Sequence, residues 1–237
     1  DRPTIVRLLD PPLHEFLPSS DEDIASVAEQ LDIPKDVLRK RIAELNEVNP
    51  MLGHRGCRLA ITYPELYEMQ VEAIIESVLQ LKKEGIECHP EIMIPLVSTV
   101  EEFITLKDRL AETITQLEND AKTNVNYLIG TMIETPRACL IAQQLAQHCD
   151  FFSFGTNDLT QLTFGFSRDD AGKFISAYSE QGILTIDPFQ TLDIDGVGQL
   201  IKQATEQAKA ANHADDLDDE ESAVEIDEEF DDAGEQE

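Results

Sequence analysis

The chain has 237 residues, of which 41% are hydrophobic, so it is long enough for one globular domain with a full core. No apolar run approaches the eighteen or more residues that span a membrane. The formal net charge is −30, and residues 215–237 carry −14 of it because they hold 14 acidic residues and no Lys or Arg. The remaining 34 acidic residues outnumber the 18 basic ones. Both parts repel a phosphate backbone, which argues against nucleic-acid binding.

The chain start and the cysteines indicate the compartment. Residues 1–8 lack an initiator Met and the layout of a signal peptide, so we expect the sequence to begin within a longer protein. The four cysteines are widely spaced without a C-x-x-C pair, which is typical of cytosolic thiols rather than of a disulfide framework or zinc site. We therefore expect a cytoplasmic protein.

Apolar strands alternate with amphipathic helices along the chain. We expect strands around Ile5, Ile92, Leu128 and Phe152. Helical spacing predicts two short helices over 21–47 interrupted at a proline, and single helices over 64–83, from 98 or 99 to about 117, over 136–148 and over 197–210. In the 64–83 helix, the apolar face is expected to include Met69, Ala73, Ile74, Leu79 and Leu81.

This alternation predicts an α/β fold with a parallel sheet covered by helices. A closed eight-stranded barrel needs about 250 residues, so residues 1–212 are too short for a complete one. The acidic segment 213–237 has few bulky apolar residues, and we expect it to be a disordered tail that adds solubility rather than a docking peptide.

An acidic residue follows each of two expected strands. Glu134 ends the strand near Leu128, and Asp158 follows the strand near Phe152, within the Gly155–Asp158 element. Two carboxylates at adjacent strand ends suit Mg²⁺. Taken alone, each acid is better explained as a helix N-terminal cap than as a metal ligand, and only their paired placement favours a metal.

Two arginines could meet an anion. Arg7 lies in an apolar strand, where a guanidinium needs an anionic partner, so either a structural ion pair or a bound anion is expected. Arg55 stands between two glycines, in a segment where the backbone can approach a ligand closely. No P-loop or G-x-G-x-x-G motif accompanies them.

The segments that carry these residues closely resemble the pyruvate, phosphate dikinases of the phosphoenolpyruvate-utilising enzyme family. The resemblance covers about residues 2–210 and is carried by segments 7–16, 49–58, 90–96, 130–134, 151–161, 166–172, 187–193 and 196–200. It implies a partial (β/α)8 TIM-type barrel, the C-terminal phosphoenolpyruvate/pyruvate barrel of a multidomain phosphotransferase. Such an enzyme interconverts ATP, pyruvate and phosphate with AMP, phosphoenolpyruvate and pyrophosphate.

The resemblance also implies roles for individual residues. Residues matching Arg7 and Arg55 bind the phosphoryl group and substrate oxygens, and those matching Glu134 and Asp158 hold the Mg²⁺ cofactor. The residues matching Gly155, Thr156 and Asn157 contact substrate, and that matching Arg168 contacts the substrate carboxylate. The implied partners are the ATP-binding domain and the phosphohistidine domain of the parent enzyme, and the family implies a homodimer. A plant-type source would place the protein in a plastid.

The chain departs from the family pattern in ways that leave more than one function open. The first and last barrel strands are expected to be missing, together with the segment that carries the family's general-acid cysteine, so no catalytic residue is expected to be retained. The alternatives to part of a dikinase are a non-catalytic module that binds phosphoenolpyruvate and Mg²⁺ or has a regulatory role, and an inactive truncated product.

Overall fold

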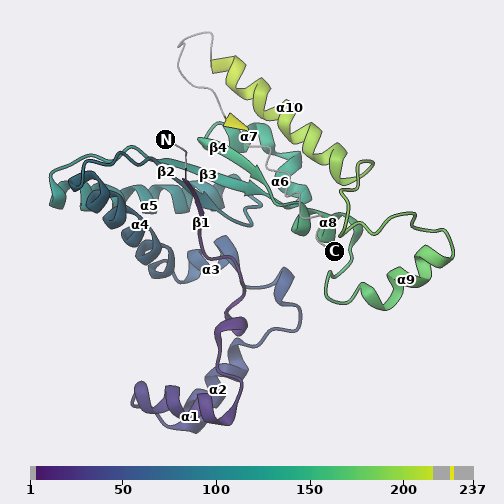
Figure 1. The fold of residues 1–237 in the computed structure, drawn as a ribbon, viewed down its shortest axis with the longest axis horizontal. Helices are drawn as coiled ribbons and strands as arrows, with labels where there is room; N and C mark the ends of the chain where they lie inside the picture. The colour runs from purple at the N-terminus through teal and green to yellow at the C-terminus, as the bar shows by residue number, and fades with distance from the viewer. Residues whose placement is uncertain (1–3, 216–224, 227–237) are drawn as a thin grey trace.

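The computed structural model describes residues 4–215 and 225–226. Its centre is a parallel sheet with strand order β1-β2-β3-β4-β5 (Figure 1). The strands are β1 (Thr4–Arg7), β2 (Pro90–Ile94), β3 (Leu128–Ile133), β4 (Phe151–Phe154) and the two-residue β5 (Glu225–Ile226). The first four strands lie where the sequence predicts them, and neighbours in the sheet follow each other in the chain. All five strands therefore end at the same edge of the sheet.

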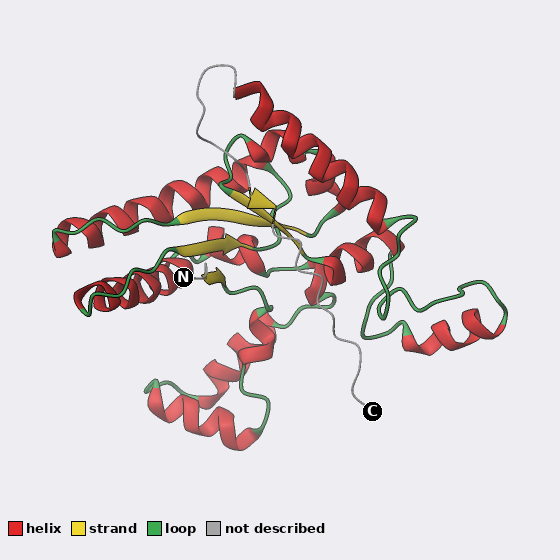
Figure 2. Ribbon diagram, turned by 45° about the horizontal axis from the view of Figure 1, so that its top comes forward, coloured by secondary structure: helices red, strands yellow, loops and turns green. Residues whose placement is uncertain are grey.

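Helices connect and cover the strands (Figure 2). The α-helices are α1 (Asp21–Gln30), α2 (Lys35–Leu45), α3 (Gly56–Thr62), α4 (Glu65–Lys83), α5 (Val100–Ala121), α6 (Pro136–Leu140), α7 (Ala142–Ala146), α8 (Thr156–Phe164), α9 (Gly172–Glu180) and α10 (Val197–Asp215). Two 3₁₀ turns, η1 (Leu13–Phe16) and η2 (Pro50–Leu52), precede α1 and α3. Helix α4 packs on α5, α5 on α7, and α7 on α10, which joins them into a continuous layer.

The main hydrophobic core lies between this layer and the sheet. Every residue of β2 is buried, as expected for a strand in the middle of a parallel sheet. The largest fully buried side chains of the core include Tyr67, Phe103 and Phe152. None of the helices within the described residues is both long and apolar enough to cross a membrane.

The helical hairpin α1–α2 stands away from the sheet and has a core of its own (Figure 1). Ile24, Ala28 and Leu38 form that small core, and partly buried apolar residues close around it. Backbone bonds close the chain excursion that carries the hairpin: Gly56 N–H donates to the Asp10 carbonyl at 3.1 Å. The excursion therefore leaves and rejoins the sheet at one point.

Several expectations about the helices need correction. The predicted face of α4 is wrong in part, because Met69 is 58% exposed while Tyr67, Val71 and Ile75 are buried. The single helix expected over 136–148 is broken at Ile141, whose φ of −112° and ψ of 18° lie outside the helical range. The sequence does not predict helices α3, α8 and α9, which are only seven to nine residues long.

The expected disordered tail is also wrong at two places. Helix α10 continues through Asp215, and Glu225–Ile226 pairs with Phe151–Phe152 of β4 as a parallel strand. The sheet thus has five strands rather than four over the described part of the chain. The other residues of segment 213–237 lie outside the described residues, so their disorder stays a prediction.

Candidate functional site

The expected site residues come from neighbouring strand ends. Arg7 is the last residue of β1, Glu134 follows β3 directly, and Gly155 follows β4. Asp158 lies in the first turn of α8, which begins immediately after β4. Because the strands are parallel and neighbours in order, these residues gather at one edge of the sheet.

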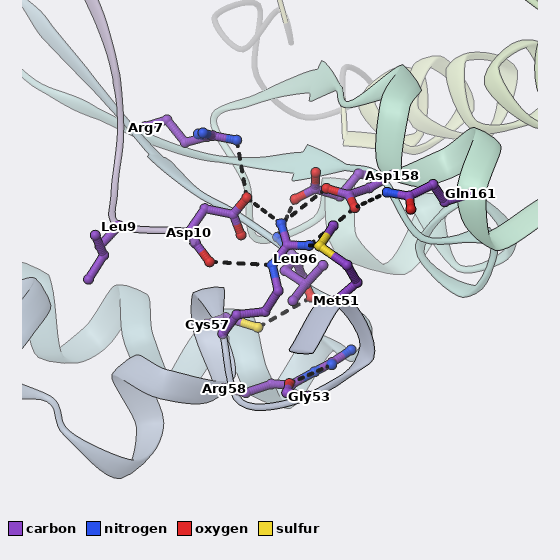
Figure 3. A network of polar contacts seen from close by, with 12 residues as sticks. Arg7, Leu9, Asp10, Met51, Gly53, Cys57, Arg58, Leu96, Asp158 and Gln161 are labelled. Carbon is purple, nitrogen blue, oxygen red and sulfur yellow. Dashed lines mark hydrogen bonds and ion pairs between the residues drawn. The ribbon is translucent and has the colours of Figure 1, made fainter. Parts of the chain in front are cut away.

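The buried guanidinium of Arg55 holds the carboxylates of Asp10 and Asp158 together, and Figure 3 shows these two acids near each other. Its Nη1 and Nη2 donate to Asp158 Oδ1 at 3.2 Å and Oδ2 at 3.1 Å, a bidentate pair. Nη2 also donates to Asp10 Oδ2 at 2.5 Å, and Nε donates to the Asp10 carbonyl at 3.3 Å. Burial by itself lowers the pKa of Arg55, but the hydrogen bonds and charges of Asp158 and Asp10 raise it above its ordinary value. Arg55 is thus a permanent cation at the centre of the site.

Glu134 is buried beside this group, 1% exposed. Its Oε1 accepts the Leu96 N–H at 2.6 Å, and Leu96 has a left-handed backbone with φ of 64°. Burial, together with the charges of Asp10 and Asp158, raises the pKa of Glu134 to about 8, although the Leu96 N–H and Arg55 act in the opposite direction. Burial and the two neighbouring carboxylates thus both disfavour the negative charge on Glu134.

The helix-cap explanation does not account for either acid. Thr135, not Glu134, caps α6, since its side chain accepts the Ala138 N–H. The N-cap of α8 is Gly155, and Asp158 lies within the helix, where its charge still benefits from the helix dipole. Neither acid is therefore the N-cap residue of the helix that follows it.

Arg7 differs from the buried cation that its strand position suggests. Its side chain is 44% exposed, and Nη1 donates to Asp10 Oδ2 at 3.2 Å. The expected anionic partner is thus a carboxylate of the chain itself. Because much of the side chain is accessible, a second anion can reach the rest of the guanidinium.

The Gly155–Asn157 segment adjoins Glu134. A Cβ placed on Gly155 would lie 2.6 Å from Glu134 Oε2 and 2.8 Å from Met132 Sδ, so only glycine fits there without a shift. Thr156 and Asn157 are exposed in the first turn of α8. The exposed Arg168 lies farther along the chain, and its backbone N–H donates to Gln161 Oε1 at 2.8 Å. Gly155 is thus packed against Glu134, whereas the Arg168 backbone is bonded to Gln161.

Asp10 is the site residue that sequence reasoning missed. Oxygens of Asp10, Glu134 and Asp158 all lie within 4.8 Å of one another, and we call these three residues the acid cluster. Asp10 follows the end of β1 by three residues, so the strand-end argument used for the other two acids could have found it. The apolar run over residues 4–9 stops at Asp10, so this signal was present in the sequence.

These three carboxylates fit a divalent cation. Carboxylate oxygens are the ligands that Mg²⁺ prefers. Asp10 Oδ1 is buried and, among the described residues, has no hydrogen-bond partner, so an acceptor is free inside the cluster. Asp10 and Asp158 also add negative charge beside the buried Glu134, which a bound cation would offset. The donor set therefore suits the metal that the sequence suggests.

Cys57 lies near the site but has no features of a reactive thiol. It is fully buried, and its Sγ donates to the Leu96 carbonyl at 3.3 Å. Burial raises the pKa of its thiol far above the ordinary value. Such a thiol stays protonated and serves packing.

An open parallel sheet with an acidic cluster at its carboxyl edge is typical of an α/β enzyme domain that binds a metal and an anionic substrate. A family profile described as "PEP-utilising enzyme, PEP-binding domain" matches residues 1–228. The chain belongs to this family.

Its similar relatives are pyruvate, phosphate dikinases. The protein of Rickettsia felis is 50% identical over 90% of this chain, and that of Clostridium symbiosum is 50% identical over 88%. "Pyruvate, phosphate dikinase 1, chloroplastic" of Arabidopsis thaliana is 53% identical over 88%. The matches cover 24%, 24% and 22% of those proteins, so the chain spans about a quarter of their length.

Proposed function

We propose that the acid cluster binds Mg²⁺ together with phosphoenolpyruvate or pyruvate, and that the chain supplies this site to a phosphotransferase of the pyruvate, phosphate dikinase type. The supporting observation is the meeting of Asp10, Glu134 and Asp158 within 4.8 Å, beside two arginines, in a chain of the phosphoenolpyruvate-utilising family. On this proposal the open sheet is part of a (β/α)8 barrel.

Glu134 and Asp158 would hold the metal, with Asp10 at its side. When bound, Mg²⁺ would supply positive charge to the enolate oxygen and carboxylate of the substrate. Arg7, with much of its guanidinium accessible, would bind the phosphoryl group. Arg55 would hold Asp10 and Asp158 in place, and could reach a phosphoryl group only by giving up one of these carboxylates. The substrate would also contact Gly155, Thr156, Asn157 and Arg168.

The remaining steps belong to partners of this domain. An ATP-binding domain and a phosphohistidine domain would exchange the phosphoryl group with this site in a homodimeric enzyme. The polypeptide 1–237 covers about a quarter of the relatives, so we expect it to bind ligands without ATP- and phosphate-dependent formation of phosphoenolpyruvate. Turnover by the purified polypeptide in a coupled assay would contradict this division of labour.

Calorimetric titration of the full chain tests the site. Oxalate, a stand-in for the enolate, and phosphoenolpyruvate should bind with Mg²⁺ and lose binding in EDTA. Glu134→Gln and Asp158→Asn should each remove the metal dependence. Arg7→Ala should weaken phosphoenolpyruvate about 10-fold or more, the value of a charge-assisted hydrogen bond, and leave oxalate nearly unchanged.

Arg39→Ala is the matched control, because Arg39 pairs with Asp21 on the distant hairpin and should leave both ligands unaffected. Equal binding in Mg²⁺ and EDTA, or normal metal dependence in Glu134→Gln, would overturn the proposal.

A further inference from the structure

Gln161 lies beside Asp158 of the acid cluster (Figure 3), and it also contacts the loop that carries Arg168. It is the sixth of the nine residues of α8, about one and a half turns from the start of that helix. Its Nε2 donates to Asp158 Oδ1 at 3.4 Å, and its Oε1 accepts the Arg168 N–H at 2.8 Å. One carboxamide therefore connects the Asp158 carboxylate to the backbone of the Arg168 loop.

The orientation of this carboxamide follows from its partners. A backbone N–H can only donate, so the carboxamide oxygen must face Arg168, and the NH₂ group then faces Asp158. Asp158 Oδ1 accepts from both Gln161 and Arg55 Nη1, so Gln161 also fixes the carboxylate that Arg55 grips. Rotation of the Gln161 amide would break both bonds at once.

Gln161 has a second, independent link to the same loop through its backbone. Its carbonyl accepts the Phe166 N–H at 3.1 Å, in the turn where Gly165 ends α8 with a left-handed φ of 67°. The backbone bond holds the turn itself, whereas the side chain connects the next part of the loop to the acid cluster. The two functions can be separated by experiment.

We propose that Gln161 is a positioning residue that couples the state of the Asp158 carboxylate to the placement of the Arg168 loop. This inference deepens the proposed function, because it makes the loop respond to what occupies the acid cluster. A change at Asp158 that releases the Gln161 amide also releases Arg168. The arginine is thus held in place for substrate only while the cluster is intact.

The test measures amide hydrogen exchange in the ligand-free full chain, so it does not depend on whether Mg²⁺ or oxalate binds. Four proteins form a double-mutant cycle: wild type, Asp158→Ala, Gln161→Leu and the double variant. Gln161→Leu keeps the size of the side chain but removes both polar groups. It should speed exchange at the Arg168 amide about 3- to 10-fold, the effect of losing one hydrogen bond.

The coupling makes a distinct prediction for the other two proteins. Asp158→Ala alone should speed exchange at the Arg168 amide, and adding it to Gln161→Leu should produce no further change. The Phe166 amide should exchange at the wild-type rate in all four proteins, since it is held by the Gln161 backbone. Gln144→Leu, an exposed glutamine on α7, should leave both amides unchanged.

Two results would overturn the proposal. One is an unchanged Arg168 amide in Asp158→Ala, which would show that the carboxylate does not control the loop. The other is equal acceleration at Phe166 and Arg168, which would mean that the end of α8 simply unfolds. Failure of metal binding in the calorimetric titration would reject the proposed function but would not alter either readout here.

Discussion

At the scale of single residues, close contacts at the site leave no room for a side chain at Gly155. Gly155→Ala should lower the free energy of unfolding by about 1–3 kcal/mol, because the new methyl group meets Glu134 and Met132 below 3 Å. It should also weaken Mg²⁺-dependent oxalate binding, since Glu134 must move. Chemical denaturation and calorimetry measure the two effects.

Gly172→Ala is the matched control, since a methyl group there meets nothing within 4 Å and its backbone is not left-handed. It should leave stability unchanged or raise it by up to about 1 kcal/mol. If both variants behaved alike, crowding at Glu134 would not explain the glycine.

The cysteines make a second residue-scale prediction. Cys57, Cys139 and Cys149 are buried, and burial raises the pKa of Cys139 to about 12. Cys88 is partly exposed. A thiol reagent should therefore modify Cys88 first in the native protein and all four cysteines in denaturant. Rapid labelling of Cys57 in a folded sample, read by peptide mass spectrometry, would contradict its packing.

At the scale of elements, α5 depends on its first turn. Thr99 forms a capping box with Glu102: its side chain accepts the Glu102 N–H at 3.0 Å, and Glu102 Oε2 accepts the Thr99 N–H at 2.9 Å. Thr99→Ala should cost about 0.5–2 kcal/mol of unfolding free energy. The melting curve should shift accordingly.

Thr115→Ala supplies the comparison within the same helix. Thr115 is exposed in the interior of α5, where alanine is the better helix former, so stability should be unchanged or slightly higher. An equal loss in both variants would show that the cap contributes nothing particular.

The elements also show what sequence can predict. The strands β1–β4 and the longer helices were found because apolar runs and helical periods are local signals. The division at Ile141 and the exposed face of α4 depend on which neighbours pack there. At the site, strand-end reasoning brought Glu134 and Asp158 together and applies equally to Asp10. The contacts of Gln161 carry no such signal, because they depend on how the chain turns after α8.

At the scale of the whole molecule, the sheet has an open edge at β1. Among the described strands, β1 pairs with β2 alone, and the Leu8 N–H donates to the Met93 carbonyl. Because donors alternate along a strand, the Ile5 N–H points to the unpaired side. We expect the polypeptide 1–237 to associate through this edge with increasing concentration.

Ile5→Pro should reduce that association, because it removes a donor on the free edge and leaves the bonds to β2 in place. Sedimentation velocity over a range of concentrations measures the effect. A wild-type chain that stays monomeric throughout would show that the edge does not drive association.

The excursion over residues 11–55 has an entropic consequence for the site. Its two ends meet where Gly56 and Arg55 bond to Asp10, so the acid cluster assembles only when that loop closes. Closing a flexible loop of this length would cost about 3 kcal/mol beyond a constant term. The hairpin α1–α2 has its own core of Ile24, Ala28 and Leu38. Once folded, it reduces the number of loop residues whose backbone must still be ordered. A hairpin remote from the chemistry thereby raises the local concentration of Arg55 around Asp10.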